Sequence, residues 1–94
     1  MFNIALLGAG RIGQVHAANI ASHSATTLWS VVDPNQEFAT RLATQYQARL
    51  QSLDEAMTDP NVHAVLIASA TDTHADLIEM AARHGKAIFC EKPV

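Results

Sequence analysis

Three glycines near the start of the chain stand where a predicted strand gives way to a predicted helix, in the stretch NIALLGAGRIGQVHAANI. Residues 2–7 form an apolar run typical of a buried strand, and apolar residues recur at helical spacing from Arg11 onward. Glycine weakens both kinds of element, so its presence here indicates a special backbone requirement. The residues Gly8, Gly10 and Gly13 have the GxGxxG spacing of a loop that holds the diphosphate of a dinucleotide.

Each glycine has a distinct expected role in such a loop. Gly8 lets the chain turn sharply off the strand, Gly10 has no Cβ to obstruct a diphosphate, and Gly13 lets the helix pack close to the sheet. Backbone N–H groups at the helix start, in Arg11, Ile12 and Gly13, would hold the anion with help from the helix dipole. The Arg11 side chain is expected to border the diphosphate or solvent.

Asp33 supplies the context that the glycines alone lack, because glycines also occur in ordinary turns. It lies twenty residues beyond Gly13, at the end of the predicted strand TTLWSVVD. There its carboxylate would accept hydrogen bonds from the adenosine ribose hydroxyls. A 2′-phosphate about 4 Å away would be repelled by up to ~4 kcal/mol per charge pair, and the following residues, Pro34, Asn35 and Gln36, supply no arginine. We therefore expect NAD rather than NADP.

The rest of the chain continues the alternation of strands and helices. We predict a helix with Pro34 in its first turn, an apolar stripe of Phe38, Leu42 and Tyr46, and a Glu37–Arg41 pair on its flank. A brief edge strand at 48–50 follows, and then a short helix opened by a Ser52–Glu55 capping box and stopped by Pro60. A central strand at 62–69 is followed by a helix over 74–85, which ends at Gly85, and then by a strand at 87–90. The expected inward stripe of that helix consists of His74, Leu77, Ile78, Ala81 and Ala82. The pattern predicts an α/β, Rossmann-type doubly wound parallel sheet of about five strands.

Length and composition limit the function classes. The 94 residues allow one domain, which we interpret as a dinucleotide-binding fragment, 1–94, of a longer enzyme. The net charge of −3 is spread along the chain and gives no basic stripe for nucleic acid or a membrane. The N-terminal apolar run is too short for a signal or membrane-spanning segment, so we expect a cytoplasmic protein. One cysteine excludes an internal disulfide, and the histidine spacing does not favour a metal site.

Candidate reactive residues follow the last two strands, because ligands lie beyond the carboxyl ends of strands in such sheets. Ser69 and Thr71 follow one strand, and Glu91 and Lys92 follow the next. Lys92 is the expected catalytic residue, since an ammonium beside nicotinamide could bind the oxygen of a substrate alcohol and share its proton. A solvated Lys92 paired with Glu91 is an equally open alternative from spacing alone.

Histidine and cysteine candidates have competing structural explanations. His74 could reach the nicotinamide ribose, although its position on an apolar stripe favours a packed histidine. His16 is expected to be structural, and His23, His63 and His84 to lie at the surface or at helix ends. Cys90 has no evident activating base and is expected to be a small buried side chain.

Three stretches together, GAGRIGQVHAANI, VVDPNQEFATRLA and VLIASATDTHADLIEMAARHGKAIFCEKPV, resemble the N-terminal domain of the glucose-fructose oxidoreductase, inositol dehydrogenase and rhizopine catabolism family. The resemblance covers nearly the whole chain, and the EKP tripeptide is its most specific part. Ala70 departs from the family, in which many members carry proline there.

The resemblance implies NAD(P)-dependent oxidation of a secondary alcohol on a cyclic polyol or sugar, and Asp33 favours NAD. It implies that Lys92 contacts the substrate, that the glycine loop binds diphosphate and that Asp33 binds ribose. It also implies a C-terminal α/β domain that completes the substrate site and builds dimers or tetramers. A dinucleotide-sensing module without catalysis, a flavoprotein and a methyltransferase remain the alternatives at this point.

Overall fold

The part of the chain that the structure describes folds into five parallel strands with two helices on each face of the sheet. A computed structural model describes residues 2–68 and 74–90. The elements in chain order are β1 (Phe2–Leu7), α1 (Arg11–Ser22), β2 (Thr26–Val32), α2 (Gln36–Tyr46), β3 (Arg49–Leu50), α3 (Leu53–Thr58), β4 (Ala64–Ile67), α4 (His74–Arg83) and β5 (Ala87–Cys90). The predicted Rossmann-type doubly wound sheet is confirmed.

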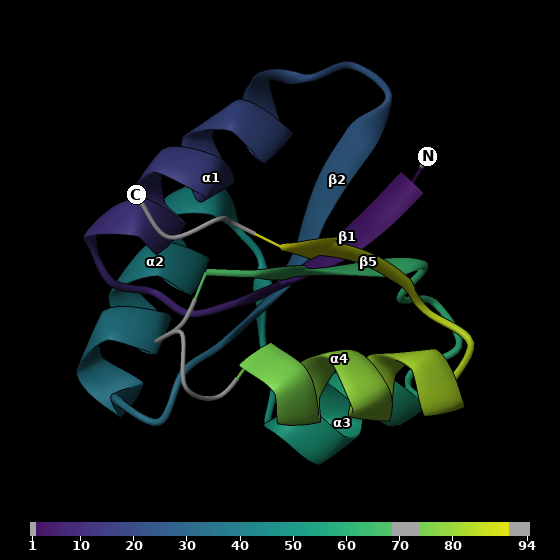
Figure 1. Cartoon of the computed structure of the whole chain (residues 1–94). Helices are drawn as coiled ribbons and strands as arrows, with labels where there is room; N and C mark the ends of the chain where they lie inside the picture. Colours follow the sequence, from purple (N-terminus) through teal and green to yellow (C-terminus); the bar gives the residue numbers. More distant parts are fainter. Residues whose placement is uncertain (1, 69–73, 91–94) are drawn as a thin grey trace.

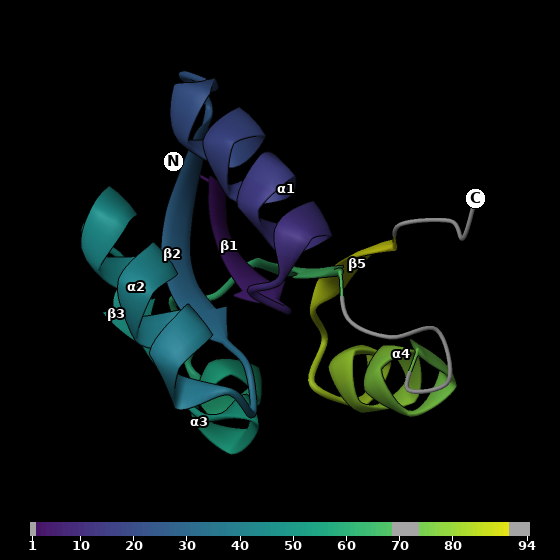
Figure 2. The same ribbon diagram turned by 90° about the vertical axis from the view of Figure 1, so that its left-hand side faces the viewer.

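The strand order β3-β2-β1-β4-β5 places the first strand at the centre of the sheet. The chain first winds outward from β1 through β2 to β3, then crosses to the other side of β1 to form β4 and β5. As a result α1 and α2 cover one face, and α3 and α4 cover the other (Figure 1). Figure 2 shows the same arrangement after a quarter turn. The direction of winding reverses between β1 and β4, which is where this class of sheet leaves a ligand crevice.

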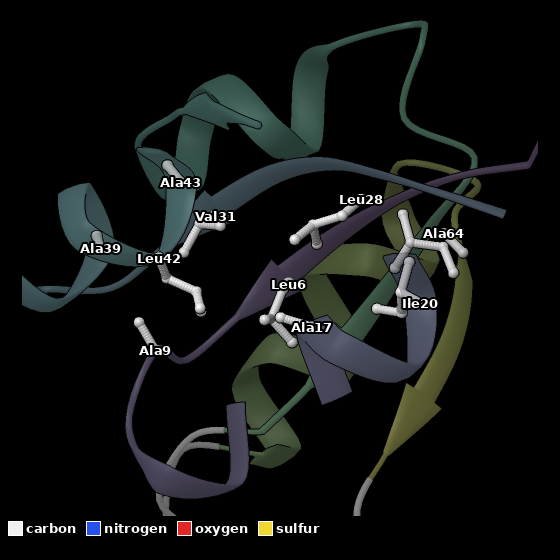
Figure 3. Close-up of a cluster of buried hydrophobic side chains, with 11 residues drawn as sticks. Leu6, Ala9, Ala17, Ile20, Leu28, Val31, Ala39, Leu42, Ala43 and Ala64 are labelled. Atoms are coloured by element: carbon white, nitrogen blue, oxygen red, sulfur yellow. The ribbon is translucent and has the colours of Figure 1, made fainter. Parts of the chain in front are cut away.

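A cluster of small and branched apolar side chains joins α1 and α2 to the sheet (Figure 3). Leu6 from β1 and Val31 from β2 are fully buried within it, together with Ala17 from α1. Leu28 also belongs to this cluster although it lies three residues from Val31, which strict strand alternation would not allow. The register of β2 against β1 shifts at this point, because Ile4 pairs with Leu28 and Ala5 pairs with Ser30. The extra residue is a β-bulge at Trp29.

A second cluster fills the other face of the sheet. It contains Val65 and Ile67 of β4, Met57 of α3 and Ala81 of α4, all with almost no exposed surface. The two faces of β4 are thus both covered, as predicted for a central parallel strand. The strand itself is shorter than the predicted 62–69, because it pairs with its neighbours only from Ala64 to Ile67.

Two local predictions for α2 are corrected. The helix begins at Gln36 with Asn35 as its N-cap, so Pro34 precedes the helix instead of occupying its first turn. Phe38 was expected on the inward stripe with Leu42 and Tyr46, but it is 44% exposed while Leu42 is buried. The inward face of α2 is centred on the buried residues Ala39, Leu42 and Ala43, so Phe38 lies at its margin. The Phe38 N–H donates to the N-cap side chain, Asn35 Oδ1, at 3.1 Å.

The inward face of α4 also differs in part from the prediction. Ala81 is fully buried and Leu77 packs against the second cluster, as expected. Ile78 is 37% exposed and Ala82 is exposed, whereas Met80 packs inward. The inward stripe therefore leaves out Ile78 and Ala82 on one side and takes in Met80 on the other.

Several other local predictions are confirmed. The edge strand β3 is present, and α3 opens with the capping box, in which Ser52 N donates to Glu55 Oε1 at 2.7 Å and Glu55 N donates to Ser52 Oγ at 3.1 Å. Arg41 and Glu37 form the expected exposed pair on α2 at 3.2 Å. None of the helices described is long and apolar enough to cross a membrane.

Asp59 ties several elements together at the amino ends of β4 and β5. Its carboxylate accepts hydrogen bonds from Asn61 N at 2.8 Å, Trp29 Nε1 at 2.9 Å and Gln51 Nε2 at 3.0 Å. The Asp59 carbonyl oxygen accepts from Lys86 Nζ at 2.6 Å. Because these donors favour the charged form, first the Asn61 amide and then the Trp29 indole, they lower the pKa of the Asp59 carboxyl from 3.8 to about 2.

This shift predicts an acid dependence of stability. A lowered folded-state pKa contributes stability that is present above pH ~4 and is lost as the pH falls through about 2. Asp59→Asn should therefore lower the midpoint of thermal unfolding near neutral pH, and its difference from the wild type should shrink between pH 4 and pH 2. Circular dichroism melts over this pH range measure it. Glu79→Gln is the control, because Glu79 is exposed in a surface pair with Arg83. A constant difference across the range would contradict the assignment.

Candidate cofactor site

The glycine loop leaves the sheet at the point where the winding reverses. Gly8 N donates to Val32 O at 2.8 Å on one side of β1, and Ala68 N donates to Leu7 O at 2.8 Å on the other. Gly8 then turns the chain with a φ of 118°, a conformation that side-chain-bearing residues rarely adopt. The loop therefore begins where β1 separates from both of its neighbours.

Gly13 and Gly10 have different reasons to lack a side chain. A Cβ on Gly13 would lie 2.1 Å from the carbonyl oxygen of Gly8 and 2.8 Å from its carbonyl carbon. Only a glycine allows α1 to approach the end of β1 this closely. A Cβ on Gly10 would meet no atom within 4 Å, so no contact within the described part of the chain requires glycine at that position. The open space beside Gly10 is consistent with access for a ligand.

The amino end of α1 is suited to an anion. Its N-cap is Gly10, which has no side chain that could cap the helix, and its first turn contains no acidic residue. By contrast, α2 is capped by Asn35 and α3 by Ser52. The first N–H groups of a helix have no partner within the helix, and they carry the positive end of its dipole. A diphosphate at this position would satisfy them.

Asp33 connects the two loops that border the site. Its Oδ2 accepts a hydrogen bond from Ala9 N at 2.7 Å, in the glycine loop, and its Oδ1 accepts from Asn35 N at 2.7 Å, in the turn before α2. A carboxylate has about four lone-pair positions, so each oxygen can still accept a further hydrogen bond. Asp33 can therefore hold the loops in place and bind a hydroxyl-bearing ligand at the same time.

A cavity of about 490 Å³ lies beside these groups at the carboxyl ends of β1, β2 and β4. Asp33 contributes a charged side chain to the cavity wall and Asn35 an amide side chain. No lysine, arginine or histidine is among the described residues that line the cavity. The other side chains are apolar and come from five segments of the described chain. The lining residues are Leu7, Gly8, Gly10, Val32, Asp33, Pro34, Asn35, Phe38, Leu53, Ala68 and Leu77.

The structure brings some of the predicted cofactor residues together. Gly8, Gly10 and Asp33 line the cavity, and Gly13 packs directly against the backbone of Gly8. Arg11 and Ile12 lie exposed in the first turn of α1 and are not among the lining residues.

The remaining predicted site residues lie wholly or partly outside the described part of the chain. Ser69, Thr71, Glu91 and Lys92 are outside it. His74 is the first residue of α4, but its side chain is not described, and the same holds for the Cys90 side chain. Among the described residues, no group of three histidine, cysteine or acidic side chains could hold a metal ion.

Comparison with known proteins identifies the family. The model of an oxidoreductase family with an NAD-binding Rossmann fold, GFO_IDH_MocA, matches residues 2–94. The chain belongs to this family. The resemblance found in the sequence motifs is thereby confirmed, and NAD is the cofactor of the domain.

Three relatives illustrate the similarity within the family. The inositol 2-dehydrogenase of Rhizobium meliloti is 46% identical over 89 residues, which is 95% of this chain and 27% of the relative. The crystal structure of a myo-inositol dehydrogenase from Corynebacterium glutamicum is 44% identical with a TM-score of 0.92, over 99% of this chain and 28% of that one. A scyllo-inositol dehydrogenase from Lactobacillus casei with bound NAD(H) and scyllo-inositol is 27% identical with a TM-score of 0.90, again over 99% and 28%. The chain thus spans little more than a quarter of these relatives.

Sequence reasoning missed three features of the site. The Asp33–Asn35 hydrogen bond spans two residues, so the DPN sequence could have indicated it as an Asx turn. The hydrogen bond from Ala9 to Asp33 could not be predicted, because it depends on how two loops meet. The same applies to Leu53 and Leu77, which approach the cavity from α3 and α4 on the far face of the sheet.

A pair of glycine variants should separate packing from ligand access. Gly13→Ala should destabilise the fold by about 1–3 kcal/mol, because the Gly8 backbone cannot move away from the new Cβ. Gly10→Ala should cost less than about 1 kcal/mol of stability. The same variant should weaken NAD binding at least tenfold, because a methyl group at the cavity wall obstructs the diphosphate. Denaturant unfolding and calorimetric titration measure the two effects. A Gly13→Ala protein as stable as the wild type would show that α1 is held in another way.

Proposed function

We propose that this chain binds NAD for the oxidation of a secondary alcohol on a cyclic polyol, with myo-inositol as the first candidate substrate. The sequence motifs look most like those of bacterial myo-inositol 2-dehydrogenases, and the relatives named above include inositol dehydrogenases. The observation that carries the proposal is the position of Asp33 between the glycine loop and the cavity.

Different groups of this chain are proposed to bind different parts of NAD. The N–H groups at the start of α1 hold the diphosphate, and the two oxygens of Asp33 accept the hydroxyls of the adenosine ribose. A 2′-phosphate at that ribose would meet the Asp33 carboxylate, with no cation among the described lining residues to offset the repulsion. This arrangement favours NAD over NADP.

The reacting end of the site is proposed to lie beyond β4 and β5. These strands are parallel neighbours, so residues that follow them share one edge of the sheet with the glycine loop. NAD bound at this site would supply the hydride acceptor for oxidation of the substrate's carbinol carbon. Lys92 hydrogen-bonds the carbinol oxygen and shares its proton, while Glu91, Ser69, Thr71 and His74 border the nicotinamide side.

The rest of the reaction is proposed to depend on a C-terminal α/β domain. The family resemblance assigns to that domain an aspartate and a histidine for substrate binding and proton abstraction. The resemblance also assigns it the sheet through which dimers or tetramers form. We place the whole protein in the cytoplasm as a homo-oligomer whose cofactor domain is the chain described here.

Cofactor titration tests the binding half of the proposal. The purified chain should bind NAD, bind NADP more weakly by up to roughly three decades, and bind neither FAD nor S-adenosylmethionine measurably. Asp33→Ala should weaken NAD about 10- to 100-fold, through loss of charge-assisted hydrogen bonds, and should narrow the gap to NADP. Calorimetry gives the affinities. Thermal unfolding of the variant shows how much of the loss of affinity comes from destabilised loops. An unchanged NAD to NADP ratio would argue against the ribose role, and preference for FAD or S-adenosylmethionine would overturn the proposal.

Substrate assays test the catalytic half. In a polypeptide that joins this chain to its substrate domain, NADH production should be greatest with an inositol among a panel of polyols and sugars. Lys92→Ala should lower kcat about 10²- to 10⁴-fold and leave the affinity for NAD within about threefold. Arg83→Ala, an exposed cation at the end of α4, serves as the control. Full activity of Lys92→Ala would assign that lysine to the solvated alternative, and activity only with another sugar would replace inositol.

A further inference from the structure

Phe38 is a large apolar side chain that the core does not use. Helix α2 buries Ala39, Leu42 and Ala43 against the sheet, and Phe38 lies outside that buried cluster. The side chain is 44% exposed. It nevertheless lines the cavity, together with Asp33 and Pro34.

The position of Phe38 is fixed relative to the glycine loop by consecutive hydrogen bonds. Ala9 N donates to Asp33 Oδ2 at 2.7 Å, and Asn35 N donates to Asp33 Oδ1 at 2.7 Å. Asn35 Oδ1 then accepts from Phe38 N at 3.1 Å. Two side chains therefore connect the backbone of the diphosphate loop to the backbone of Phe38. The backbone of Phe38 is thus positioned relative to the Asp33 carboxylate by hydrogen bonds within the protein, before any ligand binds.

We propose that the Phe38 ring is the surface on which the adenine of NAD stacks. The inference rests on the proposed function, in which Asp33 binds the adenosine ribose. Adenine is attached directly to that ribose, so it must lie close to Asp33. Among the described residues that line the cavity, Phe38 is the only aromatic one. Its ring offers the planar face that a purine requires.

The surrounding side chains support an adenine rather than a charged group at this end of the cavity. Val32, Leu53 and Leu77 add aliphatic surface from β2, α3 and α4. Stacking on an aromatic side chain is strong for any base, because every base has a π face. The Asn35 cap orders the backbone of Phe38, so little backbone freedom is lost there when the ligand binds.

Ligands that contain only one part of NAD provide the test. The purified chain is titrated by calorimetry with AMP, ADP-ribose, NAD and nicotinamide mononucleotide. Phe38→Ala should weaken AMP, ADP-ribose and NAD by a common factor of about 5- to 100-fold, and should leave nicotinamide mononucleotide unchanged. Phe38→Tyr should restore binding to within about threefold of the wild type. Phe38→Leu should recover only part of it, because it keeps apolar surface without a ring.

Leu50→Ala is the matched control. Leu50 is a large apolar side chain with a similar exposure of 45%, but it lies on the edge strand β3 and is not among the residues lining the cavity. This variant should bind all four ligands as the wild type does. Thermal unfolding checks each variant, and if Phe38→Ala fails to fold, the contrast between Phe38→Tyr and Phe38→Leu decides the question.

The outcomes separate this inference from the proposed function. If the wild type binds AMP and NAD, and Phe38→Ala binds AMP as tightly, the stacking role is wrong while the NAD site stands. Equal binding by Phe38→Leu and Phe38→Tyr would show that apolar surface suffices and would also overturn the role of the ring. If the wild type binds none of the adenine nucleotides, the proposed function fails and this inference fails with it.

Discussion

The close approach of α1 to the end of β1 is the constraint on which the site depends. No side chain fits between Gly13 and the carbonyl of Gly8, so this contact holds only for glycine. The approach brings the amino end of α1 to the point where β1 leaves its two neighbouring strands. The sheet order sets where the crevice lies, and this one contact places the helix dipole beside it.

Asp33 has a structural role in the walls of the cavity, and the proposed function gives it a recognition role as well. Its carboxylate holds the glycine loop and the turn before α2 at hydrogen-bond distance, and it is the only charged group among the described lining residues. The negative charge therefore orders the walls of the cavity, and in the proposed function it also selects which ribose is accepted. The two roles are compatible because each oxygen uses only one of its lone pairs on the backbone.

The sequence predicted what is local or repeats along the chain. The glycine spacing, the capping box at Ser52 and the period of β1 and α1 depend on near neighbours, and the structure agrees with them. Phe38 was misplaced because its spacing of four residues from Leu42 is compatible with burial, while the inward face of α2 is centred on Ala39, Leu42 and Ala43. The bulge at Trp29 and the approach of Leu53 and Leu77 depend on contacts between distant segments, and no local pattern encodes them.

The central position of β1 determines the stage of folding at which the crevice can form. The first strand made is the one that needs partners on both sides, and one of them, β4, begins about 60 residues later, where Asn3 N donates to His63 Nδ1. Pairing of strands so far apart in the sequence is slow, because the entropy of the intervening chain is lost before the new contacts compensate for it. A partly assembled chain can hold the β1–β2 half but lacks the far wall of the crevice. A crevice bounded on both sides therefore requires β1 to be paired with both β2 and β4.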